Sequence, residues 1–214
     1  MWVKEIWRYP VKSMAGEQLQ AADLTRDGIL GDRLIQTRHP SGRTLTARTR
    51  PLLLRHHATT SPANLVLVDG RPWDSPEVAP DVEAAAGPGA RLVHTDPEER
   101  FDVLPLLVMT DGALAAVGFD SRRFRPNLII GGVPGLAERQ WEGASLRIGN
   151  VTIGMQDLRA RCIMTTFDPD TGQQNLDVLR RVQREFDGVL GLNSSVISPG
   201  RISVGDIVEL VPAP

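Results

Sequence analysis

The sequence predicts a mixed α+β fold that is rich in β-structure. Short runs of apolar and β-branched residues recur at close intervals along the chain, and turn signals such as Asp27-Gly28 and Asp69-Gly70 separate them. Few stretches between these runs have helical periodicity. Strands at close and regular spacing favour a barrel-rich, mostly antiparallel fold over a doubly wound sheet.

The first part of the chain is predicted to be almost entirely strands and turns. Five runs have the length and composition of strands: 2–7, 19–24, 33–37, 52–58 and 65–68. Residues 74–90 are rich in proline and glycine, which is typical of a loop or a boundary between two halves. We therefore predict one region over 1–90 and a second over 91–214.

The second part is predicted to mix strands with two helices. Six runs indicate strands: 92–93, 104–109, 127–130, 145–148, 151–155 and 203–210. A short helix over 112–117 has Thr110 or Asp111 as its cap, and apolar residues at helical spacing predict a second helix over 176–186 with Asn175 as its cap.

Composition excludes several classes of protein. The 214 residues carry a net charge of −2, so nothing attracts the whole molecule to nucleic acid. The single cysteine excludes an internal disulfide and a multi-cysteine zinc site. No run approaches the roughly 20 apolar residues of a membrane span, and the first residues do not resemble a signal peptide. We predict a cytoplasmic protein that binds neither nucleic acid nor membrane.

Three polar segments stand out against this background. They are Tyr9-Pro10-Val11-Lys12-Ser13 with the later Gly31-Asp32-Arg33, the segment 122–128 (RRFRPNL), and the segment 158–172 (LRARCIMTTFDPDTG). If they converge in space, their arginine, lysine and serine side chains form a pocket for a multiply charged anion. The only cysteine, Cys162, lies in the third segment, where the neighbouring arginines favour a thiolate.

These segments, together with LTAR at 45–48 and ISVGDIV at 202–208, resemble the MOSC family in the family's order. The resemblance covers nearly the whole chain and is to members with an N-terminal extension, such as the amidoxime-reducing components and their bacterial relatives. It implies a MOSC-type β-barrel with an associated smaller N-terminal or central αβ subdomain. Residues 1–90 would form the N-terminal β-rich region and 91–214 the MOSC domain with the cysteine loop, with some strands intermixed.

The resemblance also implies a set of site residues. In the reductases of the family the cysteine of the RC motif binds molybdenum, and here that residue is Cys162. A soft thiolate is a suitable ligand for a metal already held by sulfur. By the same resemblance, the residues around the pterin cofactor are Lys12, Ser13, Arg33, Thr110, Asp111, Arg125, Asn127 and Arg161. One departure is Ala113, where members of the family often carry serine.

By resemblance, the chain is a molybdenum-cofactor oxidoreductase that reduces N-oxygenated substrates by two-electron oxo transfer. It has no flavin, nicotinamide or iron–sulfur motif, so electrons must come from a separate reductase of the ferredoxin or flavin type. Two alternatives stay open: a non-catalytic carrier of molybdopterin or sulfur, and a cofactor-free β-barrel interaction module. Broad descriptions of the family also mention pyridoxal phosphate, but neither lysine of this chain has the context of a pyridoxal enzyme.

Overall fold

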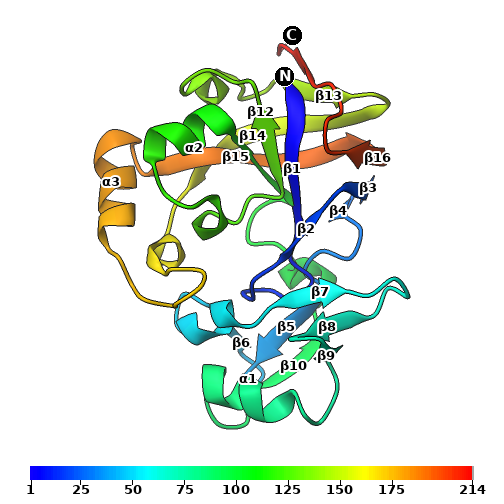
Figure 1. Ribbon diagram of the computed structural model, residues 1–214, viewed down its shortest axis with the longest axis vertical. Coiled ribbons are helices and arrows are strands. Elements are labelled where there is room, and N and C mark those ends of the chain that lie inside the picture. The colour runs from blue at the N-terminus through cyan, green and yellow to red at the C-terminus, as the bar shows by residue number, and fades with distance from the viewer. Residues whose placement is uncertain (214) are drawn as a thin grey trace.

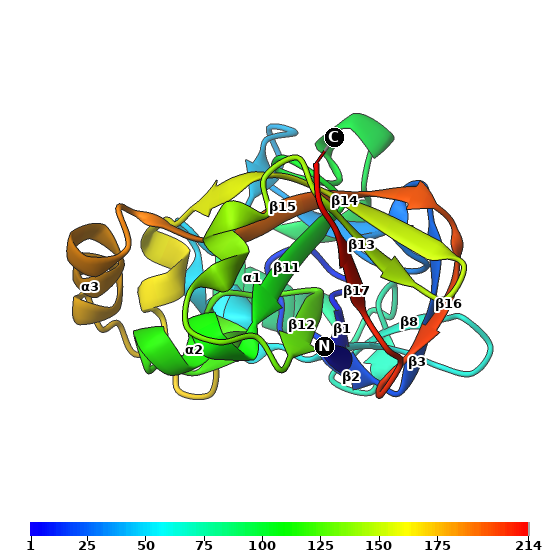
Figure 2. The ribbon, with the colours of Figure 1, turned by 90° about the horizontal axis from the view of Figure 1, so that it is seen from above.

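The computed structural model describes residues 1–213 and is built around one large mixed sheet. The strand order is β17-β13-β14-β15-β11-β12-β1-β2, and only β11 and β12 run parallel. Its strands are β1 (Trp2–Arg8), β2 (Glu17–Leu19), β11 (Leu106–Thr110), β12 (Leu128–Gly131), β13 (Ser145–Ile148), β14 (Val151–Ala160), β15 (Val189–Ser198) and β17 (Glu209–Val211). Apolar side chains from most of these strands form the largest core cluster, so the sheet curves around its own interior (Figure 2).

A second group of smaller sheets lies beside the first, in the lower part of Figure 1. One sheet has the order β10-β5-β6 and another β7-β8-β9; α1 (Ala79–Ala86) and the 3-10 helix η1 (Pro51–Arg55) pack beside them. The strands are β5 (Ile35–Arg38), β6 (Thr44–Leu45), β7 (Ala58–Thr60), β8 (Val66–Val68), β9 (Arg71–Pro72) and β10 (Arg91–His94). These elements enclose a separate apolar core.

Strands from the two ends of the chain intermix. β1 pairs with β12 and β2 pairs with β1, so both extend the large sheet, while β10 pairs back onto β5. A third small sheet joins β16 (Gly200–Ser203) to β3 (Ala21–Thr25) and β4 (Gly28–Ile29). The predicted division between residues 90 and 91, with some strands of the two regions intermixed, stays a prediction.

Helices cover one end of the large sheet. Figure 2 shows α2 (Asp111–Val117) and α3 (Asp177–Glu185) at the end opposite β16 and β17. Val178 and Val182 of α3 pack with Phe124 and Met109 in a third core cluster. Four further 3-10 helices complete the described chain: η2 (Pro97–Glu99), η3 (Ser121–Arg123), η4 (Ala137–Gln140) and η5 (Ile163–Thr166).

The predicted mixed, β-rich fold class is confirmed, but four local predictions were wrong. The run 19–24 is divided between β2 and β3, which lie in different sheets. The run 52–58 forms η1 instead of a strand, because Pro51 starts a helical turn that buries Leu53 and Leu54. The predicted loop 74–90 contains α1, whose Pro80 lies in the first turn, where no amide donor is needed. The run 203–210 is interrupted at Gly205, which has φ of 92°, so β16 and β17 are separate strands in different sheets.

The first turn of α2 is packed too tightly to accept a larger residue at Gly112. A Cβ added there would lie 2.2 Å from the carbonyl oxygen of Val133 and 2.4 Å from that of Gly135. Both obstacles are backbone atoms and cannot rotate away.

We predict that Gly112→Ala destabilises the protein by about 2 kcal/mol or more, although alanine is the better helix former. Urea unfolding would measure the difference. The matched control is Ala115→Gly at an exposed position of the same helix, which should cost about 1 kcal/mol. A more stable Gly112→Ala protein would contradict the packing described here.

Candidate functional site

A cleft between the two groups of sheets gathers residues from all three polar segments. Its empty volume is about 800 Å³, which includes open solvent at its mouth. Seven of the predicted site residues line it: Lys12, Ser13, Arg33, Arg125, Asn127, Arg161 and Cys162. The predicted convergence of segments far apart in sequence is therefore present in the structure.

The backbone is left-handed at three of these positions. Ser13, Arg33 and Arg125 have φ values of 71°, 51° and 56°. This conformation is uncommon outside glycine, asparagine and aspartate, and it persists only where the surroundings enforce it. Non-glycine residues in this conformation concentrate at functional sites, and half of the six in the described chain lie in this cleft.

The carboxylate of Asp32 ties the walls of the cleft together. It is fully buried and accepts hydrogen bonds from the Tyr9 amide at 2.7 Å, from Asn127 Nδ2 at 3.3 Å and from Arg33. The backbone carbonyl oxygen of Asp32 also accepts a hydrogen bond from Arg100 Nε at 2.8 Å. One side chain thus fixes the end of β1, the Arg33 turn and the start of β12.

Two arginines in the cleft, the buried Arg125 and the half-buried Arg161, keep hydrogen-bond donors without partners. Arg125 is 7% exposed, donates from Nη1 to Met14 O at 2.6 Å and stacks on the Tyr9 ring 4.1 Å away, while its Nη2 has no partner. Arg161 donates from Nη2 to Phe124 O at 2.6 Å, while its Nε has none.

Burial lowers the pKa of Arg125 and of Arg161 to about 10. For Arg161 the neighbouring charge of Arg159 lowers the pKa further. Both side chains are therefore still cationic at neutral pH. A buried donor without a partner is costly, so this wall of the cleft is suited to an anionic or acceptor-rich ligand.

Another part of the cleft lining carries three cations around one carboxylate. Lys12 Nζ donates to Glu99 O at 2.7 Å and forms an ion pair with Asp102 Oδ1 at 3.1 Å. Arg48 forms an ion pair with the same carboxylate, and Arg159 Nη2 lies 3.8 Å from it. Burial of Arg48 would lower its pKa, but hydrogen bonding to Cys162 and the charge of Asp102 raise it instead.

The cysteine lies at the end of a long strand, where the chain turns into the cleft. β14 ends at Ala160, Cys162 is the residue that precedes η5, and its carbonyl accepts a hydrogen bond from Thr165 Oγ1 at 2.9 Å. The side chain is only partly buried and belongs to the lining of the cleft. The thiol is thus open to a ligand in the cleft rather than sealed in the core.

Two predicted site residues lie elsewhere. Thr110 is fully buried; its Oγ1 caps α2 by accepting from the Ala113 amide and donates to Glu138 at 3.1 Å. The Asp111 carboxylate accepts hydrogen bonds from the amides of Gly132 and Val133. Neither residue lines the cleft, because the cap and the turn after β12 use their side chains.

Several residues of the cleft were not predicted from sequence. They are Thr46, Arg100, Phe101, Asp102, Val103, Leu104, Leu106, Leu107, Phe124, Arg159, Ala160, Met164, Thr165 and Asn193, while Arg48 belongs to the LTAR segment at 45–48. Arg159 could have been found, since it lies in the polar segment 158–172 that also carries Cys162. Asn193 could not, because β15 was itself missed; this asparagine accepts from Arg159 at 3.2 Å and donates to Asp157 at 3.0 Å.

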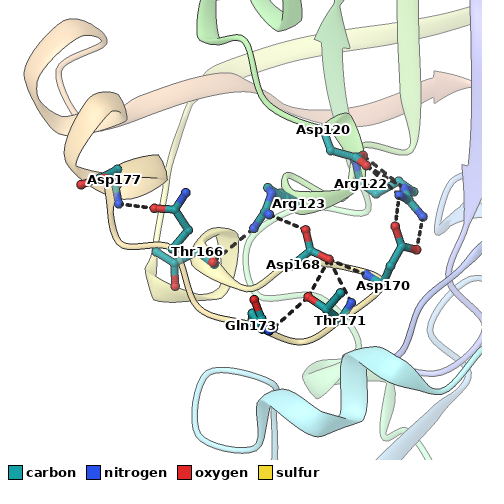
Figure 3. A network of polar contacts seen from close by, with 10 residues as sticks. Asp120, Arg122, Arg123, Thr166, Asp168, Asp170, Thr171, Gln173 and Asp177 are labelled. Carbon is teal, nitrogen blue, oxygen red and sulfur yellow. Dashed lines mark hydrogen bonds and ion pairs between the residues drawn. The ribbon is translucent and has the colours of Figure 1, made fainter.

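The acidic turn after the cysteine segment is clamped by two arginines, as Figure 3 shows. Arg122 binds both carboxylate oxygens of Asp170, at 2.8 and 2.7 Å, and Arg123 donates to Asp168 at 2.6 Å and to Thr166 O at 3.2 Å. Asp168 in turn accepts from the amides of Asp170 and Thr171. These ion pairs link the segment that carries Arg125 to the segment that carries Cys162, and they help to hold the two segments in place.

Comparison with protein families identifies this architecture. The MOSC N-terminal beta barrel domain matches residues 1–96, and the MOSC domain matches residues 107–209. The chain belongs to the MOSC family. The residues of the cleft come from both of these matched regions, so the site depends on the two together.

Relatives matched over nearly the whole of this chain are named amidoxime-reducing components. The mitochondrial amidoxime-reducing component 1 of Homo sapiens is 26% identical over 98% of this MOSC chain and 82% of its own length. A molybdenum cofactor sulfurase of Bombyx mori is 33% identical over 39% of this chain and 10% of its own. The YuaD protein of Bacillus subtilis has the same fold, with a TM-score of 0.52, 13% identity and complete coverage of both chains.

Two further findings concern the chain as a whole. Within residues 1–213, no three histidine, cysteine, aspartate or glutamate side chains cluster so as to hold a metal ion by themselves. None of the helices formed by residues 1–213 has the length and apolar character needed to cross a membrane.

We predict that Asp32→Asn destabilises the protein by about 3 kcal/mol, because it leaves the mostly buried Arg33 guanidinium without its counter-charge. Thermal and urea unfolding would measure the loss. The control is Asp23→Asn, which removes an exposed carboxylate paired with Arg201 at 2.9 Å and should change stability by about 0.5 kcal/mol or less. Equal losses of stability in the two variants would contradict the structural role assigned to Asp32.

Proposed function

We propose that this MOSC protein binds a molybdenum–pterin cofactor in the cleft and reduces N-oxygenated small molecules. The observation that carries the proposal is the cleft itself, which places a partly exposed cysteine beside buried cationic side chains with unpartnered donors. Similarity to an amidoxime-reducing component over nearly the whole chain supports the same reading.

The residues present fit such a group in their chemistry. A phosphate needs charged donors in fixed directions, and arginine supplies them in a planar fork. The free Nη2 of Arg125 and Nε of Arg161 are donors of this kind. A molybdenum ion held by the sulfurs of a pterin accepts a soft thiolate as a further ligand, and Cys162 is the one thiol in the chain.

Each residue would then have its own task. Cys162 would ligate the metal, and Lys12, Ser13, Arg33 and Arg161 would surround the pterin and its phosphate. Arg125 would offer its free Nη2 as a donor. Asn127 is already held by the Leu107 amide, Trp7 O and Asp32, so its task would be to position Arg33 and the start of β12.

When bound, the cofactor supplies the two-electron exchange that removes oxygen from an N-hydroxylated base or amidoxime with release of water. The protein positions this group and admits the substrate at the open mouth of the cleft. Electrons would come from a separate reductase of the ferredoxin or flavin type. A cytoplasmic location stays a prediction, since the amidoxime-reducing relatives are named mitochondrial.

We predict that Cys162→Ala abolishes reduction of an N-hydroxylated test base by molybdenum-loaded protein supplied with an artificial electron donor. The physical reason is that the alanine side chain cannot ligate the metal. Turnover would be followed by product chromatography, with molybdenum content per chain measured alongside. Undiminished turnover in the variant would reject direct ligation. A wild-type chain that holds molybdenum but does not reduce the base would favour a carrier of molybdopterin or sulfur.

We predict that Lys12→Ala lowers molybdenum occupancy several-fold, because a charged donor leaves the wall of the cleft. The chain offers a matched control in its only other lysine, Lys4, which is exposed on β1. Lys4→Ala should load as well as the wild-type chain. Equal molybdenum loading of the wild-type chain and both variants would contradict a role for Lys12 in the proposed site. Absence of molybdenum from all three proteins would favour the cofactor-free interaction module.

A further inference from the structure

Asp102 occupies the position in the cleft that an anionic ligand would use. Its carboxylate pairs with Lys12 at 3.1 Å and with Arg48, and Arg159 lies 3.8 Å away. All four side chains line the cleft. A single negative charge therefore neutralises part of a cluster of three positive charges.

The carboxylate of Asp102 is ionised at neutral pH. Burial would raise its pKa, but the charges of Lys12 and Arg48 hold the pKa below its ordinary value. Such a group is a poor proton donor to a substrate. Its chemistry in the cleft is that of a fixed internal anion.

The chain around Asp102 is anchored at other points, so the carboxylate can leave without unfolding its segment. The Glu99 side chain accepts hydrogen bonds from Gln36 at 2.9 Å and from Arg38 at 2.7 Å. Arg100 donates to the Asp32 backbone at 2.8 Å. The Asp102 side chain itself is 31% exposed and faces both the inner cleft and its wider, open mouth.

We propose that Asp102 determines the ligand selectivity of the cleft by competing with incoming anions for Lys12, Arg48 and Arg159. A monoanion gains no binding free energy by displacing the Asp102 carboxylate, because the monoanion brings the same charge and loses translational freedom on binding. A ligand of the phosphate-monoester or pyrophosphate class brings more charge and more acceptor oxygens, and it displaces the carboxylate. The inference rests on the proposed function only in taking the cleft as an anion-binding site.

The test compares anion binding by the full chain produced in a host that makes no molybdenum cofactor. Isothermal titration with inorganic pyrophosphate and with nitrate would be run on the wild-type chain, Asp102→Asn and Asp102→Glu. We expect Asp102→Asn to bind pyrophosphate about tenfold more tightly and to gain measurable nitrate binding. Asp102→Glu keeps the charge and should behave like the wild-type chain.

A matched control separates competition from a general change in charge. Asp157 lines the open mouth and hydrogen-bonds Asn193, but it does not pair with Lys12 or Arg48. Asp157→Asn should therefore change pyrophosphate affinity by about twofold or less at physiological salt, where exposed charges are screened. Should Asp102→Asn fail to fold, Asp102→Ser serves the same measurement.

The outcomes distinguish this inference from the proposed function. Tighter binding in Asp102→Asn alone supports competition. Unchanged or weaker binding in that variant, or an equal gain in Asp157→Asn, overturns the role of Asp102 and leaves the proposed function standing. No pyrophosphate binding by any of the proteins overturns the anion site, and with it both proposals.

Discussion

The geometry of this site depends on one buried carboxylate. Asp32 has no exposed surface, and it holds the Tyr9 amide, the Arg33 guanidinium and the Asn127 amide group in one place. These three partners belong to the end of β1, to a turn and to the entry into β12. A buried charge is tolerated only when it is paired and hydrogen-bonded, so the carboxylate and its partners stabilise one another and no partner can move alone.

The same electrostatic constraint explains how a chain of net charge −2 forms a strongly cationic cleft. Arg33 is compensated by Asp32 behind it, and Lys12 and Arg48 are compensated by Asp102 within the cleft. Arg125 and Arg161 have no carboxylate in hydrogen-bonding contact and instead rest on backbone carbonyls and aromatic rings. The wall built from these two residues is where uncompensated charge remains.

The position of the cysteine follows from the clamp on the turn that comes after it. Arg122 and Arg123 reach across from η3 to Asp170 and Asp168 (Figure 3). Individually such pairs near the surface contribute little to stability. The bidentate geometry of the Arg122–Asp170 pair nevertheless specifies direction, and the two pairs together hold the η5 segment against the loop that carries Arg125.

The sequence by itself determined the β-rich class, most strand positions, both helices over 112–117 and 176–186, and the residues of the three polar segments. These are local properties, set by side-chain periodicity, turn residues and motif order. β15 escaped prediction because Gly191 and the polar run 193–195 interrupt its apolar pattern. α1 escaped because its prolines and glycine lie at its first turn and just beyond its end, where a helix tolerates them.

Only the tertiary structure decided which polar residues share a site. Thr110 and Asp111 are polar residues of the kind that contact ligands. Their side chains instead form the hydrogen bonds of the α2 cap and of the turn after β12. Asp102 and Asn193 lie in the cleft without any local signal that joins them to the polar segments, because strand pairing and the packing of the two cores bring them together. Proximity across the chain is a property of the whole fold, and no window of sequence contains it.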